Sequence, residues 1–191
     1  MALYTSSYLK AVSANVSESR LFSERQKTHT SFDIFLSHSF LDKADVLGLY
    51  YELTQLGFSV YVDWIIDPQL DRNNVTKQSA EHIRNRMKAS KTLLLAISTN
   101  AQMSRWMPWE LGYVDGHTNK CAIVPVSKES MTLKNFERTE YLLLYPYIKR
   151  AAISYREEAF VTESANTYVS LTDWINRNAS PVFNSKNIEE L

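Results

Sequence analysis

The sequence contains little glycine and almost no cysteine. Its 191 residues include four glycines, Gly48, Gly57, Gly112 and Gly116. At these positions they form neither a G-x-G-x-x-G motif nor a Walker loop, so a bound nucleotide must be held without a glycine-rich phosphate loop. The single cysteine, Cys121, excludes an intramolecular disulfide and a cysteine-based zinc site.

The chain also lacks an excess of charge and any long apolar run. Its 21 Lys and Arg residues balance 21 Asp and Glu residues, which gives no electrostatic reason to expect nucleic acid or a membrane surface as partner. The apolar runs at 93–97 and 141–145 are too short to span a bilayer. Residues 1–27 lack the apolar stretch of a signal peptide. With a lone cysteine, these features predict a cytoplasmic protein.

Short apolar runs alternate with helical patterns through the middle of the chain. Strands are predicted over 32–37, 58–62, 92–97, 121–126 and 141–144. Helices are predicted over 46–56, 76–87 and about 100–117, with Gly57 ending the first, Thr76 capping the second, and Ser98 or Asn100 capping the third. This order predicts an α/β fold, a flavodoxin-like doubly wound five-stranded parallel sheet.

Both ends of the chain lie outside this unit. We expect an N-terminal helical extension over 1–30, the α/β domain over 31–150, and a C-terminal helical extension and tail over 151–191. Within the last segment, residues 166–178 have the pattern of an amphipathic helix.

Ligands of doubly wound folds bind beyond the carboxyl ends of the strands, next to the first strand. This rule selects residues 37–40 and the loop 63–75. His38 stands there alone, as a hydrogen-bonded loop residue or as an acid or base. Asp63, Asp67 and Asp71 recur at four-residue intervals, but Pro68 makes a solvated acidic loop the favoured interpretation over a metal site.

The segment 106–111, WMPWEL, is the most unusual in the chain. Trp106 and Glu110 stand four residues apart, on one face of a helix, and Pro108 fits only in a first turn or at a kink. Glu110 is either a desolvated functional carboxylate or an acid that favours a helix N-terminus next to core tryptophans. The pattern leaves both interpretations open.

These segments resemble the TIR (Toll/interleukin-1 receptor) domain family. FDIFLSHS at 32–39 resembles the family's first strand and serine-bearing loop, and LGFSVYVD at 56–63 resembles its second strand and the start of its BB loop. SRWMPWEL at 104–111 resembles the third-helix segment, in which a Trp-x-x-x-Glu spacing carries the NAD-cleaving glutamate. The resemblance spans about 31–150 and is strongest to bacterial stand-alone TIR proteins, such as those of the Thoeris anti-phage systems.

The resemblance implies an enzyme that takes NAD as its substrate and needs no cofactor or metal. It implies that Glu110 is catalytic. It implies substrate-binding roles for eight further residues: Phe35, Ser37, His38, Ser39, Asp63, Trp64, Ser104 and Trp106. The product would be ADP-ribose, a cyclic isomer or a conjugate, sensed by a separate effector protein.

The resemblance also implies self-association through TIR–TIR contacts. The loop 63–75 is the candidate contact, because Ile65 and Ile66 follow Trp64 as an apolar tip; the alternative is that both isoleucines pack under their own domain. Two other functions stay open. One is a non-catalytic TIR interaction module, and the other is an enzyme similar to nucleoside deoxyribosyltransferases, which shares the fold and the carboxylate chemistry. The pair of Trp106 and Glu110 favours the NAD-consuming enzyme.

Overall fold

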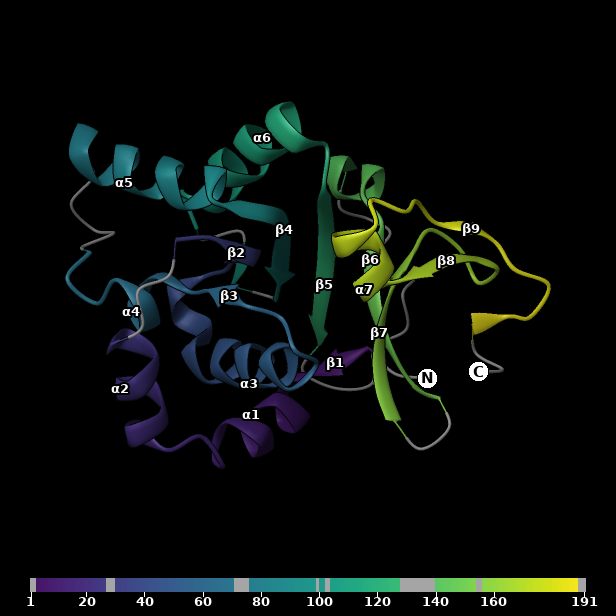
Figure 1. Ribbon diagram of the computed structural model, residues 1–191, viewed down its shortest axis with the longest axis horizontal. Helices are drawn as coiled ribbons and strands as arrows, with labels where there is room; N and C mark the ends of the chain where they lie inside the picture. Colours follow the sequence, from purple (N-terminus) through teal and green to yellow (C-terminus); the bar gives the residue numbers. More distant parts are fainter. Residues whose placement is uncertain are drawn as a thin grey trace.

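A mixed β-sheet with helices on both faces forms the centre of the protein (Figure 1). The structure is a computed structural model that describes residues 3–26, 30–70, 76–98, 100–101, 104–127, 140–153 and 156–188. Its strands are β1 Tyr4–Thr5, β2 Phe32–Ser37, β3 Val60–Tyr61, β4 Ser90–Ile97, β5 Cys121–Ser127, β6 Tyr147–Ile153, β7 Arg156–Thr162, β8 Thr167–Ser170 and β9 Val182–Phe183. Its helices are α1 Ser6–Ser13, α2 Glu18–Gln26, α3 Lys43–Gln55, α4 Asp63–Ile66, α5 Lys77–Lys88, α6 Met107–Thr118 and α7 Leu171–Asn176, with 3₁₀ turns η1 Phe40–Asp42 and η4 Glu140–Leu144.

The core of the sheet is parallel, as the sequence predicted. The strand order is β3-β2-β4-β5-β6-β7-β8-β9, and the first five strands in this order run parallel to one another. The fifth predicted strand, 141–144, is wrong, because η4 covers it and β6 at 147–153 takes its place. Leu142 is buried, but Leu143 and Leu144 are exposed, as in a surface turn and unlike a strand covered on both faces.

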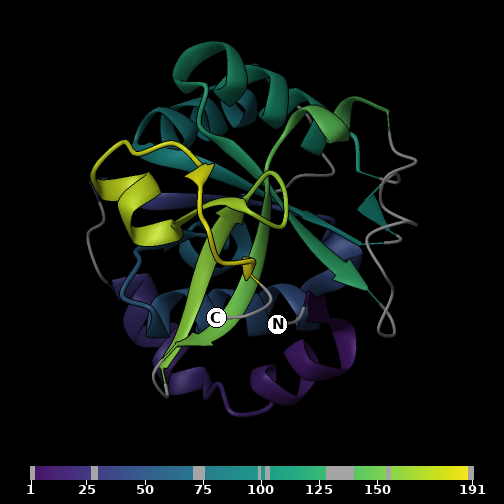
Figure 2. The same cartoon turned by 90° about the vertical axis from the view of Figure 1, so that its right-hand side faces the viewer.

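The two faces of the sheet have separate cores. On one face Ile34, Leu36 and Leu94 pack with α1 and α3, and on the other Phe35 and Leu95 pack with α5 and α6. Figure 2 shows the layers from the end, with the purple N-terminal helices below the sheet and the teal helices α5 and α6 above it. No helix within the described ranges is long and apolar enough to cross a membrane.

Two of the three predicted helix ends are confirmed. Gly57 follows α3 with a φ of 91°, a left-handed conformation that costs glycine least. Thr76 caps α5, and its side chain accepts a hydrogen bond from the Ser79 amide at 3.0 Å. The third prediction is wrong: α6 begins at Met107, and both Ser98 and Asn100 donate hydrogen bonds to Asp42 instead.

The C-terminal segment contains more strand than predicted. Strands β7, β8 and β9 extend the sheet in antiparallel order. The predicted helix 166–178 is wrong in its first half, which forms β8 as far as Ser170. Ser170 then caps α7 by accepting a hydrogen bond from the Asp173 amide at 3.0 Å. Thus only the second half keeps the helical apolar face, with Trp174 and Ile175 buried.

The N-terminal segment is helical, as expected, but it also joins the sheet. In β1, Tyr4 pairs with Val126 and Thr5 with Ser127, at the carboxyl end of β5. Helix α1 then lies against α3 so closely that a Cβ atom on Gly48 would stand 2.1 Å from the backbone oxygen of Leu9. Only a residue without a side chain allows this approach.

We expect the substitution Gly48→Ala to destabilise the protein, because the added methyl group must push α1 away from α3. The free energy of unfolding should fall by about 1–3 kcal/mol. Gly116→Ala is the matched control, since Gly116 is also helical and a Cβ there meets nothing within 4 Å. The control should be neutral or stabilising by up to about 1 kcal/mol. Urea unfolding measures both, and equal effects would contradict the close packing of α1.

Candidate active site

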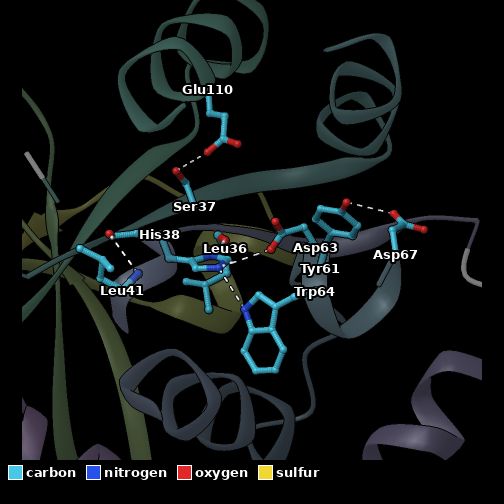
Figure 3. Close-up of polar contacts among 10 residues, drawn as sticks. Leu36, Ser37, His38, Leu41, Tyr61, Asp63, Trp64, Asp67 and Glu110 are labelled. Atoms are coloured by element: carbon cyan, nitrogen blue, oxygen red, sulfur yellow. Dashed lines mark hydrogen bonds and ion pairs between the residues drawn. The ribbon is translucent and has the colours of Figure 1, made fainter. Parts of the chain in front are cut away.

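A buried carboxylate lies at the carboxyl end of β2. Glu110 projects from the first turn of α6, and Ser37 Oγ donates a hydrogen bond of 2.6 Å to its Oε2 (Figure 3). Both residues are fully buried. Neutral hydroxyls bound to carboxylates make short, strong hydrogen bonds. The bond therefore offsets part of the cost of keeping a carboxylate out of water.

The start of α6 explains why Glu110 stands there. Pro108 falls in the first turn, where its missing N–H leaves no helical hydrogen bond unmade. The amide of Glu110 makes the first helical bond, to the carbonyl of Trp106 at 2.9 Å. An acid in the first turn is stabilised by the positive end of the helix dipole. The structural interpretation is therefore correct for the position of Glu110 but wrong for the tryptophans, because Trp106 is only half-buried and Trp109 is exposed.

Trp106 and Ser104 lie just before the first residue of α6, Met107. The ring of Trp106 is half-buried against the core on the α6 face and meets Trp109 edge-to-face, with centroids 5.5 Å apart. Ser104 Oγ accepts a hydrogen bond from the amide of Met107 at 3.3 Å and so helps to cap the helix. Both side chains thus lie at the margin of the segment that carries Glu110.

His38 is held by three neighbours (Figure 3). Its Nδ1 lies 2.9 Å from the carbonyl oxygen of Leu36, and the indole N–H of Trp64 donates to its Nε2 at 3.2 Å. Asp63 Oδ1 lies 3.4 Å from the same Nε2. Because the indole can only donate, Nε2 accepts and the ring proton sits on Nδ1, facing the carbonyl. This geometry agrees with the interpretation of His38 as a hydrogen-bonded loop residue.

The predicted site residues form two groups on opposite faces of the sheet. Side chains alternate along a strand, so Ser37 points toward α6 and His38 toward α3, as Figure 3 shows. Trp64 packs against the core on the α3 face and Trp106 against the core on the α6 face. The structure therefore brings Ser37 to Glu110, and Asp63 and Trp64 to His38, but it does not join the two groups.

Two other predicted site residues have structural surroundings. Phe35 is fully buried and stacks on Tyr61, with ring centroids 5.0 Å apart. Ser39 is buried and caps η1, because its Oγ accepts a hydrogen bond from the amide of Leu41 at 3.4 Å. In this structure Phe35 belongs to the core, and Ser39 fixes the turn that follows Ser37.

The expected exposed loop at 63–75 is wrong in its first part. Residues 63–66 form α4, and Ile65 is fully buried, so the apolar tip packs under its own domain. Asp63 and Asp67 are buried as well, each 4% exposed, and not solvated. Asp71 and Val75 lie outside the described residues.

The comparisons with known proteins identify the family. The model of the TIR domain matches residues 34–160, about two thirds of the chain. The chain belongs to the TIR domain family. It is 49% identical over 149 residues to the probable 3′ cyclic ADP-D-ribose synthase ThsB′ of Bacillus cereus (strain MSX-D12), across 77% of each protein.

Two further comparisons gave weaker similarity to this TIR protein. It is 27% identical over 95 residues to the putative cyclic ADP-D-ribose synthase TIR2 of Cytobacillus dafuensis, across 49% of this chain and 25% of that protein. The crystal structure of the TIR domain of the Toll-related receptor TRR-2 from Hydra magnipapillata aligns with 59% of this chain and 83% of its own. Its TM-score is 0.41 at 19% identity, too low to support a conclusion.

Asp67 links the end of α4 to α5, a role that the expected solvated acidic loop did not include. Its carboxylate accepts hydrogen bonds from Tyr61 Oη at 3.0 Å, His82 Nε2 at 2.7 Å, and Arg86 Nε and Nη2 at 2.8 and 2.7 Å. Burial alone would raise the pKa of Asp67, but the bonds from Arg86, His82 and Tyr61 together hold it below its usual range. The available signal was the four-residue spacing of His82 and Arg86 on one face of α5.

We expect Asp67→Asn to destabilise the protein at pH 7 by about 3 kcal/mol, because Arg86 loses a bidentate partner. The lowered folded-state pKa means that Asp67 contributes stability above its unfolded pKa and loses it as pH falls through the folded value. In urea unfolding, the difference in free energy of unfolding between the parent and Asp67→Asn should therefore be smaller at about pH 3 than at about pH 7.

The matched control for this prediction is Asp173→Asn. Asp173 pairs with Arg177 at 3.2 Å on the surface of α7, with side chains 38% and 79% exposed. Such a pair contributes under about 1 kcal/mol. A gap for Asp67→Asn that stays constant with pH would contradict the assigned role of the carboxylate.

Proposed function

We propose that this TIR domain cleaves the bond between nicotinamide and ribose in NAD and closes the remaining ADP-ribose into a cyclic product. The observation that carries the proposal is the buried carboxylate of Glu110, held by Ser37 at the carboxyl end of β2. The 49% identity to a protein named as a probable 3′ cyclic ADP-D-ribose synthase supports the same choice.

The chemistry needs one fixed carboxylate. The nicotinamide ring of NAD is positively charged, so when its bond to C1′ breaks, the electron pair stays on the ring nitrogen and nicotinamide leaves neutral. No general acid is required. The ribose becomes oxocarbenium-like, and Glu110 stabilises that developing positive charge. The proton of the attacking hydroxyl then passes to Glu110 as the new bond to C1′ forms.

The support for cyclisation over hydrolysis is the 49% identity to a probable 3′ cyclic ADP-D-ribose synthase. Glu110 and Ser37 are both fully buried, so the residues around them must move for NAD to reach the carboxylate. We propose that the bound substrate then keeps water from C1′, and that a hydroxyl of the same ADP-ribose attacks C1′ to give the cyclic product.

The remaining site residues take different roles in this proposal. Trp106 and Ser104 lie just before α6, within six residues of Glu110, so we assign them to the nicotinamide ring and its ribose. On the other face of β2, Trp64 donates a hydrogen bond to His38, and Asp63 lies beside the same ring. We assign these three residues to fixing the chain directly after Ser37, the last residue of β2.

The biological part of the proposal rests on the family resemblance. We propose that the cyclic product is an immune signal in anti-phage defence, read by a separate effector protein. We also propose that the protein self-associates through TIR–TIR contacts when it is active. Because Ile65 is buried, that contact cannot use its side chain.

We expect Glu110→Gln to lower NAD turnover by about 10²–10³-fold, because the amide keeps the shape but removes the charge that meets the oxocarbenium. The matched control is Glu81→Gln on the exposed face of the neighbouring helix α5, which should turn over NAD like the parent. Mass spectrometry resolves nicotinamide and the cyclic product under conditions in which the parent consumes NAD.

The same measurement distinguishes the alternatives. Linear ADP-ribose as the main product would overturn cyclisation and leave glycohydrolase activity. Full turnover by Glu110→Gln would overturn the assignment of the carboxylate. Association of the protein in cells without any NAD consumption would favour a non-catalytic interaction module.

A further inference from the structure

Two connections leave neighbouring strands at the edge of the sheet where Ser37 meets Glu110 (Figure 3). The β2–α3 connection, residues 38–42, passes through η1, and the β4–α6 connection, residues 98–106, leads to the helix that carries Glu110. Because β2 and β4 pair in parallel, both connections start from the same edge. The place of Glu110 therefore depends on how the second connection is held against the first.

Asp42, the last residue of η1, links the two connections. Its carboxylate accepts hydrogen bonds from Ser98 Oγ and from Asn100 Nδ2, the latter at 2.6 Å. Both donors lie within three residues of the end of β4 at Ile97. Asp42 is 8% exposed, and hydrogen bonds to a buried carboxylate are costly to break. Asp42 therefore holds the start of the β4–α6 connection against the turn that follows β2.

Helix capping does not explain the position of Asp42. It occupies the N-cap position of α3 but makes no side-chain capping bond, although capping is the usual role of an aspartate there. Its side chain bonds to the β4–α6 connection instead, so its main contacts lie outside its own helix.

The β4–α6 connection borders a cavity at the place where Asp42 holds it. Asp42, Ser98 and Asn100 line this cavity, which has a volume of about 410 Å³ and lies between the start of α1, the η1–α3 junction and the ends of β4 and β5. A side chain next to a void lacks van der Waals contacts on that side. On the cavity side, the hydrogen bonds to Asp42 therefore take the place of packing.

Short-range hydrogen bonds carry this restraint to the first turn of α6. The amide of Ala101 donates to the carbonyl of Ser98 at 3.2 Å, and the amide of Ser104 donates to the carbonyl of Ala101 at 3.0 Å. Ser104 Oγ in turn accepts from the amide of Met107, the first residue of α6, at 3.3 Å. This series of bonds runs from the residue that Asp42 holds to the helical turn that contains Glu110.

We propose that Asp42 is a positioning residue of the candidate active site, which keeps Glu110 at Ser37 by holding the β4–α6 connection. The inference rests on the proposed function, because the place of Glu110 matters for turnover only if its carboxylate acts on NAD. Asp42 acts through the connection and not by contact with the substrate. In active sites, a misplacement of about 1 Å can cost about 10²-fold in rate.

The test compares two buried aspartates on the same cavity. We expect Asp42→Ala to lower kcat for NAD about tenfold or more, because Glu110 is no longer held in place. Asp45→Ala is the matched control. Asp45 is also 8% exposed and lines the cavity, but its carboxylate accepts from Ser6 Oγ of α1, at 2.9 and 3.0 Å. The control should lose stability and keep the kcat of the parent.

A second background separates positioning from a loss of folded protein. In the variant Glu110→Gln, the added change Asp42→Ala should lower the remaining turnover by less than about twofold, because the carboxylate that Asp42 positions is already absent. An equal loss in both backgrounds would overturn the positioning role, since general damage to the fold acts regardless of Glu110.

Amide hydrogen exchange, followed by NMR, tests the restraint without turnover. Asp42→Ala should speed exchange at the amides of Ser104, Met107 and Glu110 about tenfold, because the start of α6 opens locally more often. Asp45→Ala should speed exchange in α1 instead. Unchanged exchange at the start of α6 in Asp42→Ala would overturn the positioning role.

The variant Asn100→Ala keeps the test decisive if Asp42→Ala folds poorly. It removes one of the two donors to Asp42 and leaves the carboxylate in place, so it should change kcat and exchange in the same direction. Parent values for both in Asn100→Ala would overturn the proposal. A parent protein that consumed no NAD would overturn the proposed function, and faster exchange in Asn100→Ala would still show that Asp42 holds the start of α6.

Discussion

The hydrogen bond between Ser37 and Glu110 connects the strand and the helix that carry the candidate active site. It joins the last residue of β2 to the first turn of α6, elements 73 residues apart in the chain. A carboxylate without a partner could not be buried at this place, and a helix that began elsewhere would not present it. Helix α6 therefore has to start at Met107, where Pro108 is tolerated in the first turn.

The end of β2 also positions a side chain on the opposite face of the sheet. Because successive side chains alternate, placing Ser37 toward α6 places His38 toward α3, where Trp64 donates a hydrogen bond to its ring and Asp63 lies beside it. The chain at the end of β2 is thus held by hydrogen bonds on both faces of the sheet.

The features that the sequence predicted are those with local signals. The strand 32–37, the left-handed Gly57, the cap at Thr76 and the place of Pro108 in a first turn each depend on residues a few positions apart. Glu110 could be selected because its spacing to Trp106 lies within one helical turn. Its pairing with Ser37 needed the fold, since no local pattern relates the two residues.

The features that were missed depend on partners distant in sequence. The leucines at 142–144 suit a strand by composition, but β5 pairs with Tyr147 instead. Residues 167–170 become a strand because β7 is available to pair with them. Ile65 is buried because α4 turns it into the core, and Asp67 is buried because α5 brings Arg86 and His82 to it. The sequence alone does not distinguish a solvent-exposed acidic loop from a buried carboxylate such as Asp67, because the difference depends on partners that are distant in sequence.

The N-terminal segment makes the two faces of the carboxyl edge chemically different. On the α6 face a single carboxylate is paired with one hydroxyl and lies near the positive end of a helix, which suits it to meet a developing cation. On the α3 face, β1 and α1 close over the ends of β4 and β5 and bring Ser6 to Asp45. Without that segment, the cavity beside Asp45 would lose one wall, and the Asp45 carboxylate would lose the hydrogen bond from the Ser6 hydroxyl. The close approach of Leu9 to Gly48 fixes the segment in place, so the cavity on this face depends on a contact made far from any residue that would touch NAD.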